Sequence, residues 1–205
     1  MTESSQDRDQ PLVVGLAAST RRGGNSDTLL RAVLDGAEAC GARTETIVLA
    51  ARAVAPCIGC QRCQATGECV IADDFQQIRD RLLDADAVIF ATPIYFWNVP
   101  SPAKAYIDRN QSTGARKALA RKEGRSLRPA GRTTLGVILA VAADPTPKFA
   151  GAKQTLEALF RSNEITAWDE LLVTGLFGPG EAASQEDLLA RARDLGGRLA
   201  EAIGD

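Results

Sequence analysis

The chain has 205 residues, 45% of them hydrophobic, so it is long enough for one sizeable core and short for two domains. Its formal net charge is −2, and it has no basic cluster with interleaved aromatic residues, which argues against a nucleic-acid partner. The sequence contains no histidine, which excludes Ser-His and Cys-His nucleophile pairs and leaves no residue that we can name as a general acid or base.

The N-terminal residues MTESSQDRDQ are polar and predict a disordered tail over residues 1–10, followed by a single domain over residues 11–205. They form neither a signal peptide nor a membrane span, and no apolar run in the chain reaches the length needed to cross a bilayer. We therefore expect a cytoplasmic protein with no membrane partner.

The next residues predict a strand, an anion-binding loop and a helix. Leu12–Ala18 is almost continuously apolar, which is typical of a strand buried on both faces of a parallel sheet. The polar turn Ser19–Ser26 precedes a helix expected over Ser26–Cys40, so its backbone amides lie at the positive end of the helix dipole. The turn matches neither the dinucleotide fingerprint nor the nucleotide-triphosphate loop, and it suits a terminal phosphomonoester such as that of FMN. The alternative is an ordinary turn with a Ser or Asn cap.

Apolar runs and helical spacing alternate along the rest of the chain. Further strands are expected over Arg43–Ala50, Ala87–Thr92, Thr134–Ala142 and Ile165–Thr174. Further helices are expected over Asp74–Ala85, from Pro100 or Pro102 to Asp108, over Phe149–Arg161 and over Gln185–Ile203.

Five strands alternating with helices predict an α/β fold, a doubly wound parallel sheet with helices on both faces. The strand count favours the flavodoxin-like order 2-1-3-4-5 over the six-stranded dinucleotide-binding type. In that order the carboxyl ends of the first, third and fourth strands meet. We therefore expect the loops after Ala18, Thr92 and Ala142 to build one site.

The loop after the third strand concentrates aromatic residues. Tyr95, Phe96 and Trp97 follow one another between Pro93 and Pro100 in a chain that is only 5% aromatic. Such a loop suits a flat ring system, which could stack on the aromatic faces and meet backbone amides with its polar atoms. The competing interpretation is a contact between subunits, and both can hold together.

Four of the five cysteines lie in one short segment with the spacing C-x2-C-x2-C-x5-C. They are Cys57, Cys60, Cys63 and Cys69. Thiolates at this spacing can converge on one small inorganic core, with Cys69 closing the same cluster and Gly67 supplying a turn. A [4Fe-4S] cluster, a metal-free thiol loop and a structural zinc site all remain open. The fifth cysteine, Cys40, is expected to be a small core residue.

The segment Gln111–Arg132 is basic and only weakly periodic. It predicts a solvated helical or loop insertion. Its functional interpretation is a site for the phosphates of a pyridine nucleotide or for a partner subunit, and its alternative is a charged surface segment.

The first loop and the aromatic loop resemble the two signatures of the NADPH-dependent FMN reductase family, within the flavodoxin-like superfamily. The family pattern is roughly G-S-P-R-x-x-G-N-T followed by P-x-Y-x8-K-x-x-I-D-R. Here Ala18 replaces the usual Gly, Thr20 the common Pro and Ser26 the common Thr, while PIYFWNVPSPAKAYIDR carries the second signature.

This resemblance implies non-covalently bound FMN. The residues it implies at the FMN phosphate are Ser19, Arg21, Asn25 and Ser26, and those at the isoalloxazine ring are Pro93, Ile94, Tyr95, Phe96, Trp97 and Asn98. Lys104, Asp108 and Arg109 also match the second signature, and we interpret them as structural supports of the aromatic loop.

The cysteine pattern resembles that of the iron-sulfur flavoproteins, which belong to the same superfamily and bind a [4Fe-4S] cluster just after the second strand. Two functions follow. The first is an FMN-dependent oxidoreductase that passes electrons from NAD(P)H to a quinone, a flavin or another small acceptor. The second is an electron carrier that exchanges electrons with a ferredoxin-type protein through the cluster and FMN. The resemblance also implies a homodimer or homotetramer.

Overall fold

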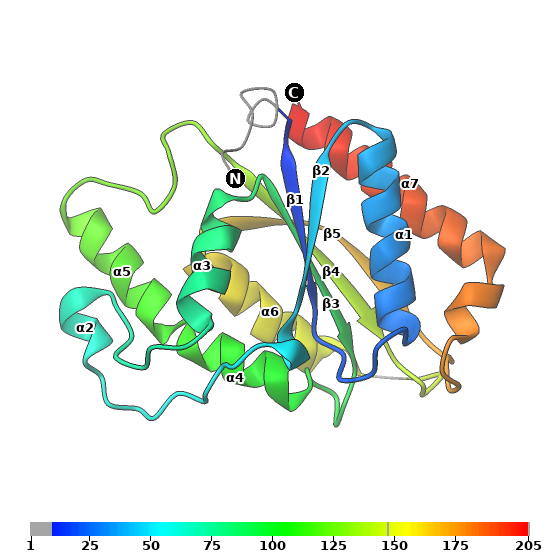
Figure 1. Ribbon diagram of the computed structural model, residues 1–205, viewed down its shortest axis with the longest axis horizontal. Helices are drawn as coiled ribbons and strands as arrows, with labels where there is room; N and C mark the ends of the chain where they lie inside the picture. The colour runs from blue at the N-terminus through cyan, green and yellow to red at the C-terminus, as the bar shows by residue number, and fades with distance from the viewer. Residues whose placement is uncertain (1–9, 147, 205) are drawn as a thin grey trace.

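Five parallel strands form the centre of the fold, in the order β2-β1-β3-β4-β5 (Figure 1). The computed structural model describes residues 10–146 and 148–204, so residues 1–9 of the predicted tail lie outside the described residues. The strands are β1 (Leu12–Ala17), β2 (Arg43–Val48), β3 (Ala87–Pro93), β4 (Thr134–Val141) and β5 (Ile165–Val173). The predicted flavodoxin-like order is confirmed.

Helices cover both faces of the sheet. Helices α1 (Asn25–Ala39) and α7 (Glu186–Gly204) cover one face, and α3 (Phe75–Asp84), α4 (Ser101–Arg109) and α6 (Ala150–Ser162) cover the other (Figure 1). The remaining elements are short or peripheral: η2 (Leu49–Ala51), α2 (Cys63–Thr66), α5 (Gln111–Lys122) and η3 (Glu181–Ser184). Helix α5 packs outside the sheet layers, against α2, α4 and α6.

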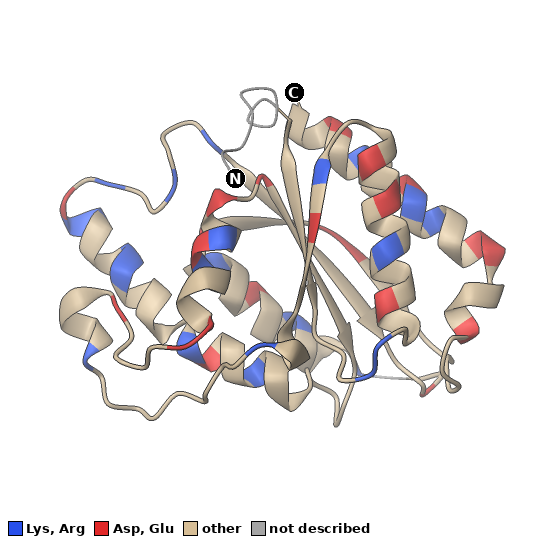
Figure 2. Ribbon diagram, viewed as in Figure 1, with Lys and Arg blue, Asp and Glu red and all other residues tan. Residues whose placement is uncertain are grey.

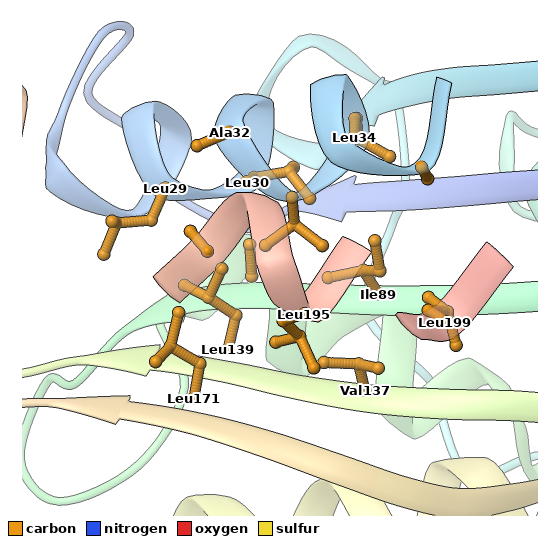
Figure 3. Packing of buried hydrophobic residues seen from close by; sticks show 14 of the residues in the cluster. Leu29, Leu30, Ala32, Leu34, Ile89, Val137, Leu139, Leu171, Leu195 and Leu199 are labelled. Atoms are coloured by element: carbon orange, nitrogen blue, oxygen red, sulfur yellow. The ribbon is translucent and has the colours of Figure 1, made fainter. Parts of the chain in front are cut away.

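The central strands are apolar throughout because both of their faces are covered. Along β1, Val13 and Ala17 pack in the cluster beneath α1 and α7, while Val14 and Leu16 pack in the opposite cluster. Figure 3 shows the first of these clusters, in which side chains from both helices meet those of the sheet. Alternation of side chains across the strand therefore places every residue of β1 in a core.

The strand pairing brings the functional loops to one edge of the sheet. The last pair between β1 and β3 is Ala17 with Ala91, and β3 and β4 end with Pro93 paired to Val141. The loops that leave these three strands lie together at the lower edge in Figure 1. No helix within residues 10–146 and 148–204 combines the length and the apolar character that crossing a bilayer would require.

Two sequence expectations need correction. Cys40 is exposed and is not a core residue, because α1 ends at Ala39 and the chain turns away. The basic segment is also not simply solvated. Its first half forms α5, whose Ser112 and Thr113 are buried, and Arg128 in the following loop is buried as well.

Candidate functional site

The phosphate loop, residues 18–24, joins β1 to the N-terminus of α1. The Ser19 hydroxyl accepts a hydrogen bond from the Arg21 backbone N–H and lies 3.0 Å from the Arg21 carbonyl, to which it also donates. Gly24 occupies the N-cap position in an extended conformation, and no side chain of the described residues caps the first N–H groups of α1. Uncapped N–H groups at the positive end of a 15-residue helix are suited to an anion.

These groups open into a cleft of about 160 Å³. Ser19, Arg21, Asn25 and Ser26 line it on one side, and Pro93, Ile94 and Tyr95 on another. The cleft thus brings together the loops that the strand order predicts should meet. Of the residues expected at the flavin ring, Phe96, Trp97 and Asn98 do not line this cleft.

The segment after β5 also lines the cleft, through Leu176 and Phe177, although no sequence motif had indicated it. Its glycine and proline residues beyond the last strand were the available signal. Asn25 holds this segment in place, because its side-chain Nδ2 donates to the Gly178 carbonyl at 2.9 Å and its Oδ1 accepts from the Ala182 N–H at 3.0 Å. The Asn25 side chain, expected at the phosphate, is therefore engaged with the protein backbone.

The aromatic loop, residues 94–99, is built on a tight reverse turn. Tyr95 and Asn98 exchange two backbone hydrogen bonds of 2.8 and 2.9 Å. Phe96 and Trp97, at the centre of the turn, have φ angles of 48° and 62°, a left-handed conformation that costs non-glycine residues on the order of 1–3 kcal/mol. The turn holds the Phe96 side chain fully in solvent beside the cleft, and the Lys148 ammonium lies 4.8 Å from the centre of the Trp97 ring.

The four clustered cysteines line a second, smaller cavity. Cys57, Cys60, Cys63 and Cys69 all face it, together with Arg109. Burial raises the pKa of the Cys63 thiol, and the neighbouring Cys69, Cys60 and Cys57 raise it further. Gly67 ends α2 with a φ of 74° and donates its N–H to the Cys63 carbonyl, which confirms that it supplies the predicted turn.

The possible metals differ in how far apart they hold the cysteine sulfur atoms. Within the described part of the chain, no group of three or more Cys, Asp or Glu side chains is close enough to hold a single metal ion. A zinc ion with Zn–S bonds of about 2.3 Å needs its sulfurs within about 4 Å of one another. A [4Fe-4S] cluster binds each cysteine to a different iron and so requires a wider arrangement around one cavity. The four cysteines share this cavity under all three interpretations.

Arg109 is the last residue of α4, and its side chain contacts the segment that contains the cysteines. Its side chain is 0% exposed, and its guanidinium donates to the Cys69 Sγ at 3.2 Å and to both Asp73 carboxylate oxygens at 2.8 and 3.2 Å. It also donates to the backbone carbonyls of Ala55 and Ile71, each at 2.9 Å. Arg109 was predicted to support the aromatic loop. It has a structural role, but its contacts support the cysteine segment instead.

The basic segment 111–132 uses two of its arginines structurally. Figure 2 shows its positive charges on α5 and the loop that follows. Arg128 donates to the carbonyls of Leu82, Leu83 and Ala85 at 2.8–3.1 Å, which caps the C-terminal end of α3. Arg132 forms an ion pair with Asp86 at 2.7 Å. These contacts favour the charged structural segment over a nucleotide site.

A solved structure and two curated proteins resemble this chain. The flavone reductase structure superposes with a TM-score of 0.67 at 21% identity, over 95% of this chain and 63% of that one, which shows the fold alone. An iron-sulfur flavoprotein of Archaeoglobus fulgidus is 32% identical over 93% of this chain and 79% of its own length. A putative NAD(P)H-dependent FMN-containing oxidoreductase of Bacillus subtilis is 34% identical over 46% of this chain and 49% of its own length.

The family comparison covers the phosphate loop, the cysteine segment and the aromatic loop together. The sequence model of the NADPH-dependent FMN reductases matches residues 11–146, which extend from the start of β1 to beyond the end of β4. The chain belongs to the NADPH-dependent FMN reductase family.

Proposed function

We propose that the chain takes electrons from NAD(P)H and passes them through bound FMN to a quinone, a free flavin or another small acceptor. The observation that carries the proposal is the cleft in which the uncapped end of α1 meets the aromatic loop. FMN, when bound, supplies the exchange of electrons with both the donor and the acceptor.

The residues of the chain bind and orient the flavin. The N-terminal N–H groups of α1 and the Arg21 guanidinium would neutralise the phosphate. In the aromatic loop the Ile94 N–H is donated to the Val141 carbonyl, and the Tyr95 N–H is donated within the turn. The Phe96 and Trp97 N–H groups have no hydrogen-bond partner among the described residues, so they are the donors left for the polar edge of the ring.

The test is anaerobic reduction of the purified flavoprotein by NADH and by NADPH in separate experiments, followed by flavin absorbance. We expect at least one of them to bleach the oxidised flavin bands. A flavoprotein that dithionite reduces and neither nucleotide reduces would contradict the proposal.

Arg21→Glu tests the phosphate site. We expect the affinity for FMN to fall by about 100-fold, because a charge-assisted contact is lost and a negative charge is placed beside the phosphate. Titration of the apoprotein with FMN, followed by flavin fluorescence, measures this affinity. Arg121→Glu makes the same charge change on α5, remote from the cleft, and should bind FMN as the wild type does. Equal FMN affinity in all three proteins would place the phosphate elsewhere.

The second candidate is an electron carrier with a [4Fe-4S] cluster, which exchanges electrons with a ferredoxin-type protein. It is favoured by the four cysteine side chains that share one cavity and by the guanidinium that contacts Cys69. Cys57, Cys60, Cys63 and Cys69 would ligate the irons, and Arg109 would hold Cys69 in place.

Cys60→Ser separates the two functions. We expect the variant purified without oxygen to lose most of its iron and its electron exchange with ferredoxin while keeping FMN, since Cys60 does not line the flavin cleft. Iron, sulfide and zinc are quantified on the same samples, with Cys40→Ser as the matched control outside the cavity. Wild-type protein with zinc or with no metal would contradict the cluster, and full ferredoxin activity in Cys60→Ser would contradict the carrier role.

A further inference from the structure

The segment after β5, residues 174–182, forms one wall of the flavin cleft, and Phe177 is its largest exposed side chain. Of the six phenylalanines in the chain, only Phe96 and Phe177 are exposed. Phe96 does not line the cleft, whereas Phe177 lines it and is 77% exposed. A large apolar face that lines a concave site is typical of a contact for the apolar part of a ligand.

The backbone on both sides of Phe177 is anchored to the rest of the fold. Leu176 is buried, and its N–H donates to the Ala142 carbonyl at 3.3 Å. The Asn25 side chain donates from its Nδ2 to the carbonyls of Leu176 and Gly178, at 3.4 and 2.9 Å. One amide group thus binds the two neighbours of Phe177, so the exposed ring is carried by a fixed piece of backbone.

Asn25 also connects this wall to the phosphate end of the cleft. It is the first residue of α1, the helix whose N-terminal N–H groups are suited to an anion. Its Oδ1 accepts the Ala182 N–H at 3.0 Å, so both polar atoms of its amide bind the segment after β5. Figure 1 shows this segment beside the beginning of α1. The helix that would hold the phosphate therefore also sets the position of Phe177.

We infer that Phe177 contacts the isoalloxazine ring of FMN and that Asn25 is the positioning residue that holds Phe177 there. The ring is flat and presents broad apolar faces, which match the face of a phenylalanine. Ile94 and Tyr95 line the same cleft from the loop after β3, so two separate loops enclose the ring. The inference rests on the flavin site of the proposed function, and it adds a ring contact that lies outside both family signatures.

Riboflavin tests the ring contact, because it carries the isoalloxazine ring without the phosphate. Titrations of the apoprotein with riboflavin and with FMN, each followed by flavin fluorescence, give the two affinities. We expect Phe177→Ala to weaken both ligands by about tenfold and so to leave the ratio of their affinities unchanged. Phe177→Tyr keeps the ring and should bind both as the wild type does. Ile58→Ala removes an exposed apolar side chain that does not line the flavin cleft, and it is the matched control.

The positioning role of Asn25 is tested with riboflavin alone, because this ligand has no phosphate that Asn25 could contact. We expect Asn25→Ala to weaken riboflavin by about fivefold. The double variant Asn25→Ala/Phe177→Ala should bind riboflavin within about twofold of Phe177→Ala, since Asn25 acts through Phe177 and has nothing left to position. Losses that multiply in the double variant would show that Asn25 acts independently and would contradict the positioning role.

Three results would overturn the ring contact. They are a Phe177→Ala variant that binds riboflavin as the wild type does, a Phe177→Ala variant that loses more affinity for FMN than for riboflavin, and a wild-type protein that binds FMN and does not bind riboflavin. The test is separable from the proposed reaction, because flavin binding needs no electron donor. If the affinities fall as expected and neither NADH nor NADPH reduces the flavin, the proposed reaction fails and the ring contact stands. If a nucleotide reduces the flavin and Phe177→Ala binds riboflavin normally, only the ring contact fails.

Discussion

Arg109→Met is expected to lower the free energy of unfolding by about 3–5 kcal/mol, the range seen when one partner of a buried ion pair is removed. The variant keeps an unbranched side chain of similar length, so it removes the charge and the donors with little change in volume. Urea unfolding, followed by far-UV circular dichroism, measures the difference.

The size of the effect follows from the buried hydrogen-bond acceptors to which Arg109 donates. Asp73, 11% exposed, would lose its bidentate partner, and the carbonyls of Ala55 and Ile71 would each lose a donor. Burial alone would raise the pKa of Asp73, but Arg109 and the backbone N–H groups of Ala55 and Phe75 hold it below its ordinary value of 3.8. This contribution to stability is therefore fully present above pH 3.8 and is lost as the pH falls through the lower folded-state pKa.

Lys104→Met on the same helix is the matched control. Lys104 pairs with Asp108 at 2.7 Å, but both side chains are about half exposed, so the pair is worth roughly 0.5 kcal/mol or less. Lys104 and Arg109 match the same family signature, but the structure predicts a much larger loss of stability for Arg109→Met than for Lys104→Met. Equal stability losses in the two variants would show that Arg109 does not hold the cysteine segment.

The sequence was sufficient to predict the sheet because hydrophobic runs report burial directly. Leu12–Ala17 and Ala87–Ala91 are buried on both faces, and both runs read as strands from their composition alone. The order of five such strands then places the carboxyl ends of β1, β3 and β4 together, which is how the flavin cleft could be located.

The partners of polar side chains could not be read in the same way, because they lie far along the chain. Asn25 binds backbone groups more than 150 residues away, and Arg109 contacts residues 36 to 54 positions earlier. A motif match gives the position of each side chain and leaves its direction open. For this reason the sequence did not indicate that the Asn25 side chain contacts the segment after β5 or that Arg109 contacts the cysteine segment.

The close approach of α1 and α7 is a further feature that hydrophobic spacing does not reveal. The inward leucines of α7 are regular, and Figure 3 shows Leu195 and Leu199 packed against the cluster under α1. Between the two helices, however, the contact is made by glycine. A Cβ on Gly36 would lie 2.0 Å from the Arg193 carbonyl oxygen, and one on Gly196 would lie 1.8 Å from the Val33 carbonyl oxygen.

Gly196→Ala is therefore expected to destabilise the fold by about 3 kcal/mol or more, because backbone atoms cannot move aside and the helices must separate along their length. Gly197→Ala, one residue later in α7, should have the opposite sign. Its Cβ would lie 3.4 Å from the Cys40 Sγ, an ordinary contact, and alanine favours the helix by about 0.5–1 kcal/mol over glycine. Urea unfolding of both variants beside the wild type measures the two changes. If Gly196→Ala were as stable as Gly197→Ala, α1 and α7 would not pack through Gly196. Both variants would then differ from the wild type only by the higher helix propensity of alanine.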